Sequence, residues 1–200
     1  MDTIVVKAQG KINLSLDVLG RRDDGYHNIR SVMQSIALYD RLKIRKTNSD
    51  IKLITNFNFT STTNNLAYRA AQLFFSATNI KAGVSIELEK GIPISAGLGG
   101  GSADAAAVLW CLNQLYKTNL SIEELQNLAY ILGADIPFCL QGGTLLAEGI
   151  GEKLSLLPPM PDCVIVLVKP SYSISTQNAY QQIQPSMFGD YYTTPLIGAL

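Results

Sequence analysis

The stretch from Pro93 to Ala107 reads PISAGLGGGSADAAA and constrains the fold more than any other part of the chain. Four of the five residues from 97 to 101 are glycines, which adopt positive φ angles easily and let several backbone N–H groups point at one spot. Ser102 is a favourable N-cap, and the alanines after it are strong helix formers. The unpaired amides of a helix N-terminus add to those of the loop. The pattern therefore predicts a glycine loop and a helix N-terminus that together bind phosphate.

Two common phosphate-binding templates do not fit this loop. No Lys-Ser/Thr pair follows the glycines, so it is not a Walker P-loop. It also departs from the dinucleotide fingerprint, because the sixth position is Ser102, the loop lies in mid-chain, and no acidic residue follows a strand at the expected distance. A structural turn is the alternative, but Pro93 and the alanine-rich helix favour a nucleotide polyphosphate.

The composition excludes several classes of function. Sixteen basic and sixteen acidic residues cancel, which disfavours nucleic acid and anionic membranes as partners. The chain contains no long apolar run, and its first residues lack the apolar core of a signal peptide, so we expect a cytoplasmic protein. Cys111, Cys139 and Cys163 lack metal-site spacing and are predicted to be buried free thiols. The single histidine, His27, argues against hydrolase triads and histidine-rich metal sites.

The hydrophobic pattern predicts alternating strands and helices. Ile12, Leu14, Leu16 and Val18 have a period of two, which predicts a strand with these residues in the core and with Lys11 and Asn13 on the opposite face. A turn follows at Asp24-Gly25, and residues 29–38 fit either a helix or a strand. Further strands are predicted near residues 42–44, 51–53, 84–88 and 144–147. Helices are predicted over 64–79, from the glycine loop to about Tyr116, and from the Ser121 capping box to Gly133.

The prolines at 158, 159 and 161 predict a domain boundary. Val164–Val168 is predicted to begin new β structure, and the composition becomes polar after residue 170. One strand and one helix cannot close a domain, so we expect residues 1–157 to form one domain and residues 158–200 to be only the start of a second.

Three segments together resemble one enzyme family. The glycine stretch resembles the phosphate-binding motif of the GHMP small-molecule kinases. AQGKINLSLDVLGRRDDGYHNIRSVMQSIALYD and LGADIPFCLQGGTLLAEGIGE are similar to segments of one branch, the 4-diphosphocytidyl-2-C-methyl-D-erythritol kinases. The resemblance covers residues 8 to about 180. It implies an α+β fold, the GHMP kinase fold, with a ribosomal S5 domain 2-like N-terminal domain, a ferredoxin-like C-terminal domain, and the active site between them.

The resemblance implies transfer of the γ-phosphate of ATP to the tertiary 2-hydroxyl of 4-diphosphocytidyl-2-C-methyl-D-erythritol, a step in the non-mevalonate isoprenoid pathway. It makes Asp135 the base that accepts the hydroxyl proton, a role that phosphoryl transfer to a poor nucleophile requires. It places Lys11 beside this base, where an ammonium stabilises developing negative charge. Without the resemblance, Asp135 reads as a turn residue before Pro137 and Lys11 as a surface lysine.

The resemblance also implies the ligand-binding residues. Asn13 would bind substrate hydroxyls, and Tyr26, His27 and Tyr180 would bind the cytosine, with the base lying between the two tyrosines. Tyr180 reads equally well as a core residue, and the family more often has Phe there. Magnesium is expected with ATP, with no protein ligands assigned, although Ser102 serves in the wider superfamily. The predicted ATP-binding residues are Pro93, Ile94, Ser95, Ala96, Gly97, Leu98, Gly99, Gly100, Gly101, Ser102, Ala103, Asn65 and Lys90.

Three alternatives stay open at this point. The chain could be a sister GHMP kinase of the homoserine or mevalonate type, against which the Asp24–His27 turn argues. An S5-like RNA-binding module is disfavoured by the zero net charge and the glycine loop. A catalytically incomplete fragment is the third. As partners we expect ATP and a small cytidyl substrate, and as assembly a monomer or a weak homodimer.

Overall fold

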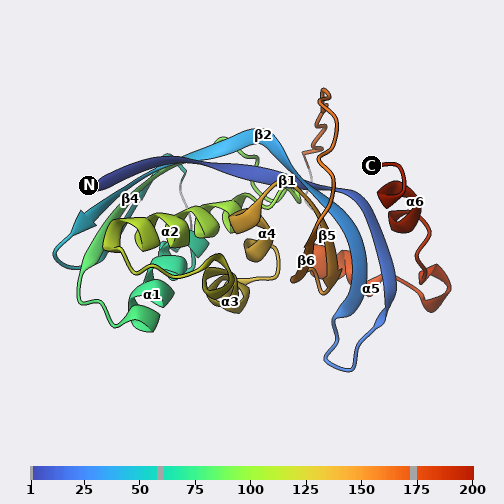
Figure 1. The fold of residues 1–200 in the computed structure, drawn as a ribbon, viewed down its shortest axis with the longest axis horizontal. Helices are drawn as coiled ribbons and strands as arrows, with labels where there is room; N and C mark the ends of the chain where they lie inside the picture. Colours follow the sequence, from blue (N-terminus) through green and yellow to red (C-terminus); the bar gives the residue numbers. More distant parts are fainter. Residues whose placement is uncertain (1, 58–60, 172–174) are drawn as a thin grey trace.

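The computed structural model describes residues 2–57, 61–171 and 175–200. Within them, six strands form one sheet in the order β3–β4–β2–β5–β6, with β1 paired to β2. Only the β3–β4 pair is parallel. Helices α1 to α4 lie beneath one face of the sheet (Figure 1). The strands are β1 (Thr3–Arg21), β2 (His27–Thr47), β3 (Ile51–Thr55), β4 (Gly83–Glu89), β5 (Thr144–Gly149) and β6 (Lys153–Leu156).

Strand β2 organises the sheet because both of its edges are used. One edge pairs with β1. On the other edge, β4 pairs with Arg41–Thr47 and β5 with Ile29–Gln34. Residues 35–40 lie between these two partners. Here the Ser35 amide donates to the Gly143 carbonyl at 2.9 Å, and the Asp40 carboxylate accepts from the Gly91 amide at 2.7 Å. Residues 29–38 are therefore strand, and two loops enter the sheet at its centre.

The β1–β2 ribbon is irregular where the first loop enters. Gln9 pairs with Tyr39 but Lys11 pairs with Ser35, so β2 carries extra residues at this bulge. The Lys11 amide donates instead to the Leu98 carbonyl at 2.9 Å, which ties the glycine loop to β1. The predicted facing of β1 is wrong at three positions, since Lys11 and Asp17 are buried whereas Leu16 is 42% exposed. Val18 is buried as predicted. Two further register shifts in β1 break the period of two on which that prediction relied.

The three predicted helices are present, but one of them starts earlier than predicted, and the short helix at Ile136–Gln141 was not predicted. The Ser121 capping box is present, and the Gly133 amide donates to the Ala129 carbonyl at 3.3 Å. The second helix does not start at Ser102 but at Gly100, because Gly99 with φ +66° is its N-cap. Its buried alanines let it approach the sheet and α1 closely. The four helices of this layer are α1 (Leu66–Thr78), α2 (Gly100–Tyr116), α3 (Ile122–Leu132) and α4 (Ile136–Gln141).

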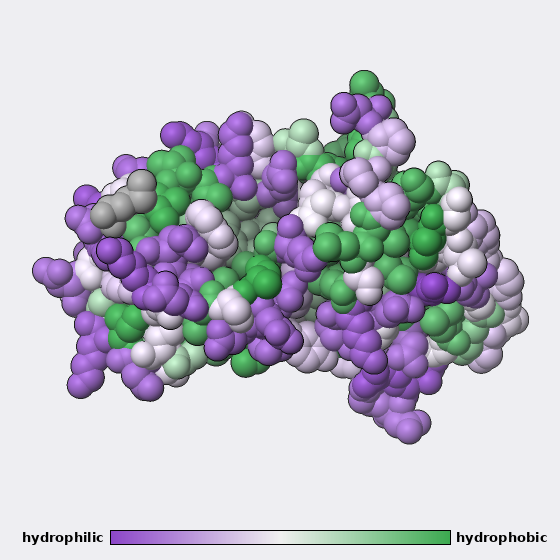
Figure 2. Space-filling view, viewed as in Figure 1, coloured by the Kyte–Doolittle hydropathy of each residue, from purple (hydrophilic) through white to green (hydrophobic). Residues whose placement is uncertain are grey.

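The segment after β6 differs most from the predictions. Residues 157–170 contain no regular structure, so the strand predicted at Val164–Val168 is wrong. Strands need neighbours that accept and donate backbone hydrogen bonds, and no described strand pairs with this segment. It projects from the body and carries exposed apolar residues, Val164 being 91% exposed (Figures 1 and 2). Cys163 is likewise exposed, contrary to prediction, whereas Cys111 is buried as predicted.

The chain then returns to the body. It forms α5 (Thr176–Gln181), a short 3-10 helix η1 (Pro185–Met187) and α6 (Thr193–Ile197). Helix α6 lies beside the β1–β2 ribbon, on the side away from helices α1 to α4 (Figure 1).

Candidate active site

A pocket of about 410 Å³ lies over the glycine loop and the start of α2. A hollow is also visible near the middle of the face shown in Figure 2. The pocket contains most of the residues that the sequence predicts for ATP. Ala103 is the exception, because it is buried behind the loop at 2% exposure. The predicted residues that line the pocket are Asn65, Lys90, Pro93, Ile94, Ser95, Ala96, Gly97, Leu98, Gly99, Gly100, Gly101 and Ser102.

The conformation of the loop suits an anion. Ser95, Gly97 and Gly99 have φ angles of 54°, 74° and 66°, and such alternation turns backbone amides toward a common point. The first hydrogen bond of α2 runs from the Ala103 amide to the Gly99 carbonyl at 2.8 Å. The amides of Gly100 to Ser102 therefore precede the helical ladder and are available to a ligand. A Cβ on Gly99 would lie 2.9 Å from Cγ of Lys11, so this glycine also makes room for the lysine.

A buried ionic cluster supports the pocket from below. The Lys90 ammonium contacts the Asp40 carboxylate and lies 2.7 Å from Oδ2 of Asp104. Burial raises the pKa of Asp104 to about 7, against the opposing effect of Lys90. Its Oδ1 has no hydrogen-bond partner. Lys90 thus lines the pocket as predicted, but its ammonium is held by two carboxylates. Asp40 and Asp104 were not predicted as site residues. A sequence signal for Asp104 exists, because it is the single charged residue of the alanine-rich helix α2.

The structure brings Lys11 and Asp135 together from distant parts of the chain. The Lys11 ammonium lies 3.2 Å from Oδ2 of Asp135 and donates to Oδ1 of Asn13 at 2.9 Å. The Asn13 amide in turn donates to the Ser31 hydroxyl at 2.7 Å. Asp135 is the N-cap of α4, but its side chain makes no capping hydrogen bond. The carboxylate is 37% exposed, so it is accessible as well as paired.

Residues of the predicted cytidyl site gather at the start of β2. The His27 ring lies 5.3 Å from the Tyr180 ring, tilted by 33°, and 6.2 Å edge-on from the Phe188 ring. Burial, and then the Asp135 carboxylate, raise the pKa of Tyr180. The aromatic cluster is therefore within electrostatic reach of Asp135. Tyr26 stands apart at 60% exposure. Sequence reasoning missed Phe188, which lies outside every quoted motif.

The site offers few protein ligands for a metal. Within the described ranges, no three His, Cys, Asp or Glu side chains are grouped so that they could hold an ion. The same ranges contain no helix long and apolar enough to cross a membrane.

Comparisons with known proteins place this geometry in a family. Residues 65–143 match the GHMP kinases N terminal domain. The chain aligns with the crystal structure of a 4-(cytidine 5'-diphospho)-2C-methyl-D-erythritol kinase at a TM-score of 0.80 and 37% identity, covering 98% of this chain and 71% of the other. The chain belongs to the 4-diphosphocytidyl-2-C-methyl-D-erythritol kinase family.

Curated members of the same kinase family agree in sequence. The kinase of Lachnoclostridium phytofermentans is 50% identical over 186 residues, which are 92% of this chain and 64% of that protein. The kinase of Clostridium botulinum is 51% identical over 177 residues, which are 88% of this chain and 63% of that protein. The chain thus spans about 64% of the length of these kinases, and it carries the GHMP kinase fold.

Proposed function

We propose that this chain provides the nucleotide-binding and catalytic residues of a kinase that phosphorylates the 2-hydroxyl of 4-diphosphocytidyl-2-C-methyl-D-erythritol with ATP. The observation that carries the proposal is the Lys11–Asp135 pair at 3.2 Å, in a family whose curated relatives are kinases of this name. Residues 1–157 would form the ATP-binding domain, and residues 158–200 would begin the second domain. The free thiols of the three cysteines support a reducing, cytoplasmic location.

The chemistry proposed for the pair is general-base catalysis. Asp135 accepts the proton of the 2-hydroxyl while the hydroxyl oxygen bonds to the γ-phosphorus of ATP. The bond between the γ-phosphorus and the oxygen that bridges to the β-phosphate breaks in the same step. Lys11 orients the carboxylate and offsets negative charge as the alkoxide develops. Asn13 holds the lysine through its Oδ1, and we also assign it to the substrate hydroxyls.

ATP is proposed to bind in the glycine pocket, with its phosphates on the amides of Gly97 to Ser102. Asn65 lines the same pocket, although its Oδ1 already accepts from the Ala67 amide at 2.8 Å as the N-cap of α1. Magnesium would neutralise phosphate charge, held by phosphate oxygens, by water and by one carboxylate that lines the pocket. Oδ1 of Asp104 is the buried carboxylate oxygen, within the described ranges, that lacks a partner and suits such an ion. The cytosine would lie against Tyr26, His27 and Tyr180.

The test is ATP consumption with the cytidyl alcohol, beside homoserine, mevalonate and galactose as control acceptors. The full-length L. phytofermentans relative is the parallel enzyme, because this chain spans only part of its length. We expect turnover with the cytidyl alcohol alone. Turnover with a control acceptor would move the chain to a sister kinase. A silent chain beside an active relative would show that residues 1–200 do not suffice for turnover.

A further inference from the structure

A short segment near the end of the chain crosses back over the β1–β2 ribbon. We call residues 188–194 the strap. It follows η1 and runs into α6, and the Gly189 amide donates to the Val18 carbonyl at 3.0 Å. The strap therefore joins the ribbon close to the turn that carries Tyr26 and His27.

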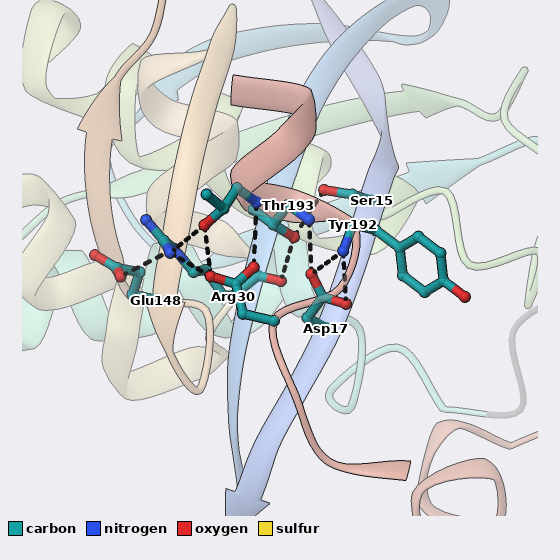
Figure 3. Close-up of polar contacts among 8 residues, drawn as sticks. Ser15, Asp17, Arg30, Glu148, Tyr192 and Thr193 are labelled. Atoms are coloured by element: carbon teal, nitrogen blue, oxygen red, sulfur yellow. Dashed lines mark hydrogen bonds and ion pairs between the residues drawn. The ribbon is translucent and has the colours of Figure 1, made fainter. Parts of the chain in front are cut away.

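The main anchor of the strap is a buried carboxylate on β1. Asp17 is 3% exposed, and its Oδ2 accepts from the Tyr192 amide at 3.0 Å and from the Thr193 amide at 2.7 Å (Figure 3). Burial raises the pKa of Asp17, but hydrogen bonds from Thr193 and Tyr192 outweigh it, so the pKa lies below its usual value. Asp17 is therefore charged at neutral pH and fully engaged with the strap.

Hydroxyl groups add hydrogen bonds between the strap and the ribbon at the same place. Thr193 is fully buried, and its hydroxyl donates to the Arg30 carbonyl at 3.0 Å and bonds the Ser15 hydroxyl at 2.9 Å. Figure 3 shows Ser15, Asp17 and Thr193 converging between the ribbon and the start of α6. The Ser15 and Asp17 side chains of β1 thus form a polar socket that binds Thr193 of the strap.

Arg30 supplies a second anchor from β2. Its guanidinium pairs with Asp190 and donates to the Thr194 hydroxyl at 2.7 Å. Glu148 of β5 lies on its other side, at 3.5 Å from the Arg30 Nε. Asp190 also accepts from the Thr194 amide at 3.1 Å, which folds the strap upon itself.

Burying the Asp17 carboxylate costs free energy, and the strap offsets this cost. A carboxylate buried in a strand is unfavourable unless donors satisfy it, and the hydrogen bonds described for the Asp17 carboxylate come from strap amides. An apolar residue would pack a strand at this position with less penalty. The group therefore serves the placement of the strap more than the stability of the sheet.

The strap carries one ring into the candidate site. Phe188 is its first residue, and its ring meets the edge of the His27 ring, while Tyr180 meets the same histidine in a tilted stack. Since Gly189 is hydrogen-bonded to Val18, the backbone at Phe188 is held against the ribbon. The position of the histidine ring thus depends on two rings from the C-terminal part of the chain.

We propose that the strap is a positioning element of the cytidyl-binding side, in which Asp17 and Arg30 hold Phe188 so that its ring fixes the orientation of His27. Asp17, Arg30 and Phe188 are positioning residues that act through His27. The inference rests on the proposed function for its effect on substrate, but the placement of the histidine can be tested without substrate.

The first experiment uses the fact that His27 is the single histidine of the chain. Its ring proton resonances report the neighbouring aromatic rings in a histidine-labelled sample. We expect Phe188→Ala and Asp17→Asn each to shift these resonances in the same direction. The double variant should match Phe188→Ala alone, because Asp17 acts through Phe188. Tyr192→Ala is the matched control, since it removes an exposed strap ring but keeps the backbone amide bound to Asp17.

Unchanged His27 resonances in Asp17→Asn, or shifts that simply add in the double variant, would overturn the proposal. Arg30→Lys tests the strap independently of Asp17. The Arg30 side chain is partly exposed, and losing its guanidinium leaves the contacts of Asp17 with the strap intact. The variant should shift the same resonances by a smaller amount. Identical spectra for Arg30→Lys and the unaltered chain would show that Arg30 does not help to position Phe188.

The second experiment measures steady-state kinetics. Ordering one side chain is worth about 0.5–1.5 kcal/mol, so Phe188→Ala should raise KM for the cytidyl alcohol about twofold to twelvefold and leave KM for ATP unchanged. Phe188→Tyr keeps the aromatic ring, so its KM for the cytidyl alcohol should equal that of the unaltered chain. Equal rises in both KM values would indicate a general structural defect and contradict the proposal. If neither this chain nor the full-length L. phytofermentans relative transfers phosphate to the cytidyl alcohol, the proposed function fails, while the resonance experiment still decides the strap.

Discussion

The glycine pocket takes most of its wall from one continuous stretch, Pro93–Ser102, whereas the aromatic cluster takes His27 from β2 and its other two rings from beyond residue 175. The pocket is further supported by buried ion pairs, with Asp40 fully buried. The cluster is half-buried and anchored through the strap. The proposed nucleotide pocket is therefore encoded mainly by one local stretch, whereas the proposed cytidyl side is formed by residues that lie far apart in the sequence. The Lys11–Asp135 pair adjoins both regions, because Lys11 lies against Gly99 and the Asp135 carboxylate raises the pKa of Tyr180.

The largest effect is expected where the two regions meet. Asp135→Asn keeps the shape of the side chain but removes the proton acceptor, so kcat should fall about 10²- to 10⁴-fold with KM for ATP unchanged. Steady-state kinetics with varied ATP and varied cytidyl alcohol separate these terms. Asp162→Asn, at an exposed position, is the matched control. Turnover near the normal rate in Asp135→Asn would rule out Asp135 as the base.

A second prediction concerns the buried support of the pocket. Asp104 has a pKa of about 7 in the folded chain and an ordinary value of 3.8, so the folded state binds more protons between these limits. Its contribution to stability therefore falls as pH rises from about 4 to 7, with a slope of at most about 1.4 kcal/mol per pH unit. Urea unfolding across this range should show a shallower decline for Asp104→Asn. The same pH profile in both proteins would contradict the assignment.

A third prediction tests the loop itself. Gly99→Ala places a Cβ on a residue with φ +66° and 2.9 Å from Lys11, so it should destabilise the fold by about 1–2 kcal/mol and weaken ATP binding. Urea unfolding and titration with a non-hydrolysable ATP analogue measure the two effects. Gly20→Ala is the control, because a Cβ there would meet nothing within 4 Å. Equal stability of the two variants would show that the loop tolerates a side chain at Gly99.

The smallest effect is expected at the exposed edge of the aromatic cluster. Tyr26 is 60% exposed, so its stacking on cytosine should be worth about 1 kcal/mol. Tyr26→Ala should raise KM for the cytidyl alcohol about fivefold with kcat unchanged. An unaltered KM would remove Tyr26 from the binding residues, and the cytosine would then depend on His27 and Tyr180.

Local signals account for the parts of the fold that were predicted well. The capping box at Ser121, the turn at Gly25 and the amphipathic helix α1 each depend on residues a few positions apart. The glycine loop belongs to this class, since its positive φ angles follow from its own residues. The start of α2 at Gly100 was missed because Ser102 is a good cap by type, but the left-handed turn is made by Gly99.

Contacts between distant residues account for the rest. The facing of β1 was wrong because bulges shift its pleat, and because Asp17 finds its donors in a strap that lies 175 residues further along the chain. The strand predicted at Val164–Val168 has the right residue types but pairs with no described strand. No pattern in the sequence indicates that Phe188 lies against His27.

The sequence by itself determined the glycine loop, the helix that follows it, and, through the resemblance, the pairing of Lys11 with Asp135. These depend on backbone conformations and motifs that few residues encode. The tertiary structure alone decided which face of β1 is buried, how Lys90 is shared by two carboxylates, and which rings surround His27. The physical reason is that burial and hydrogen-bond satisfaction are properties of neighbours in space, which a strand or loop acquires only when the whole chain has folded.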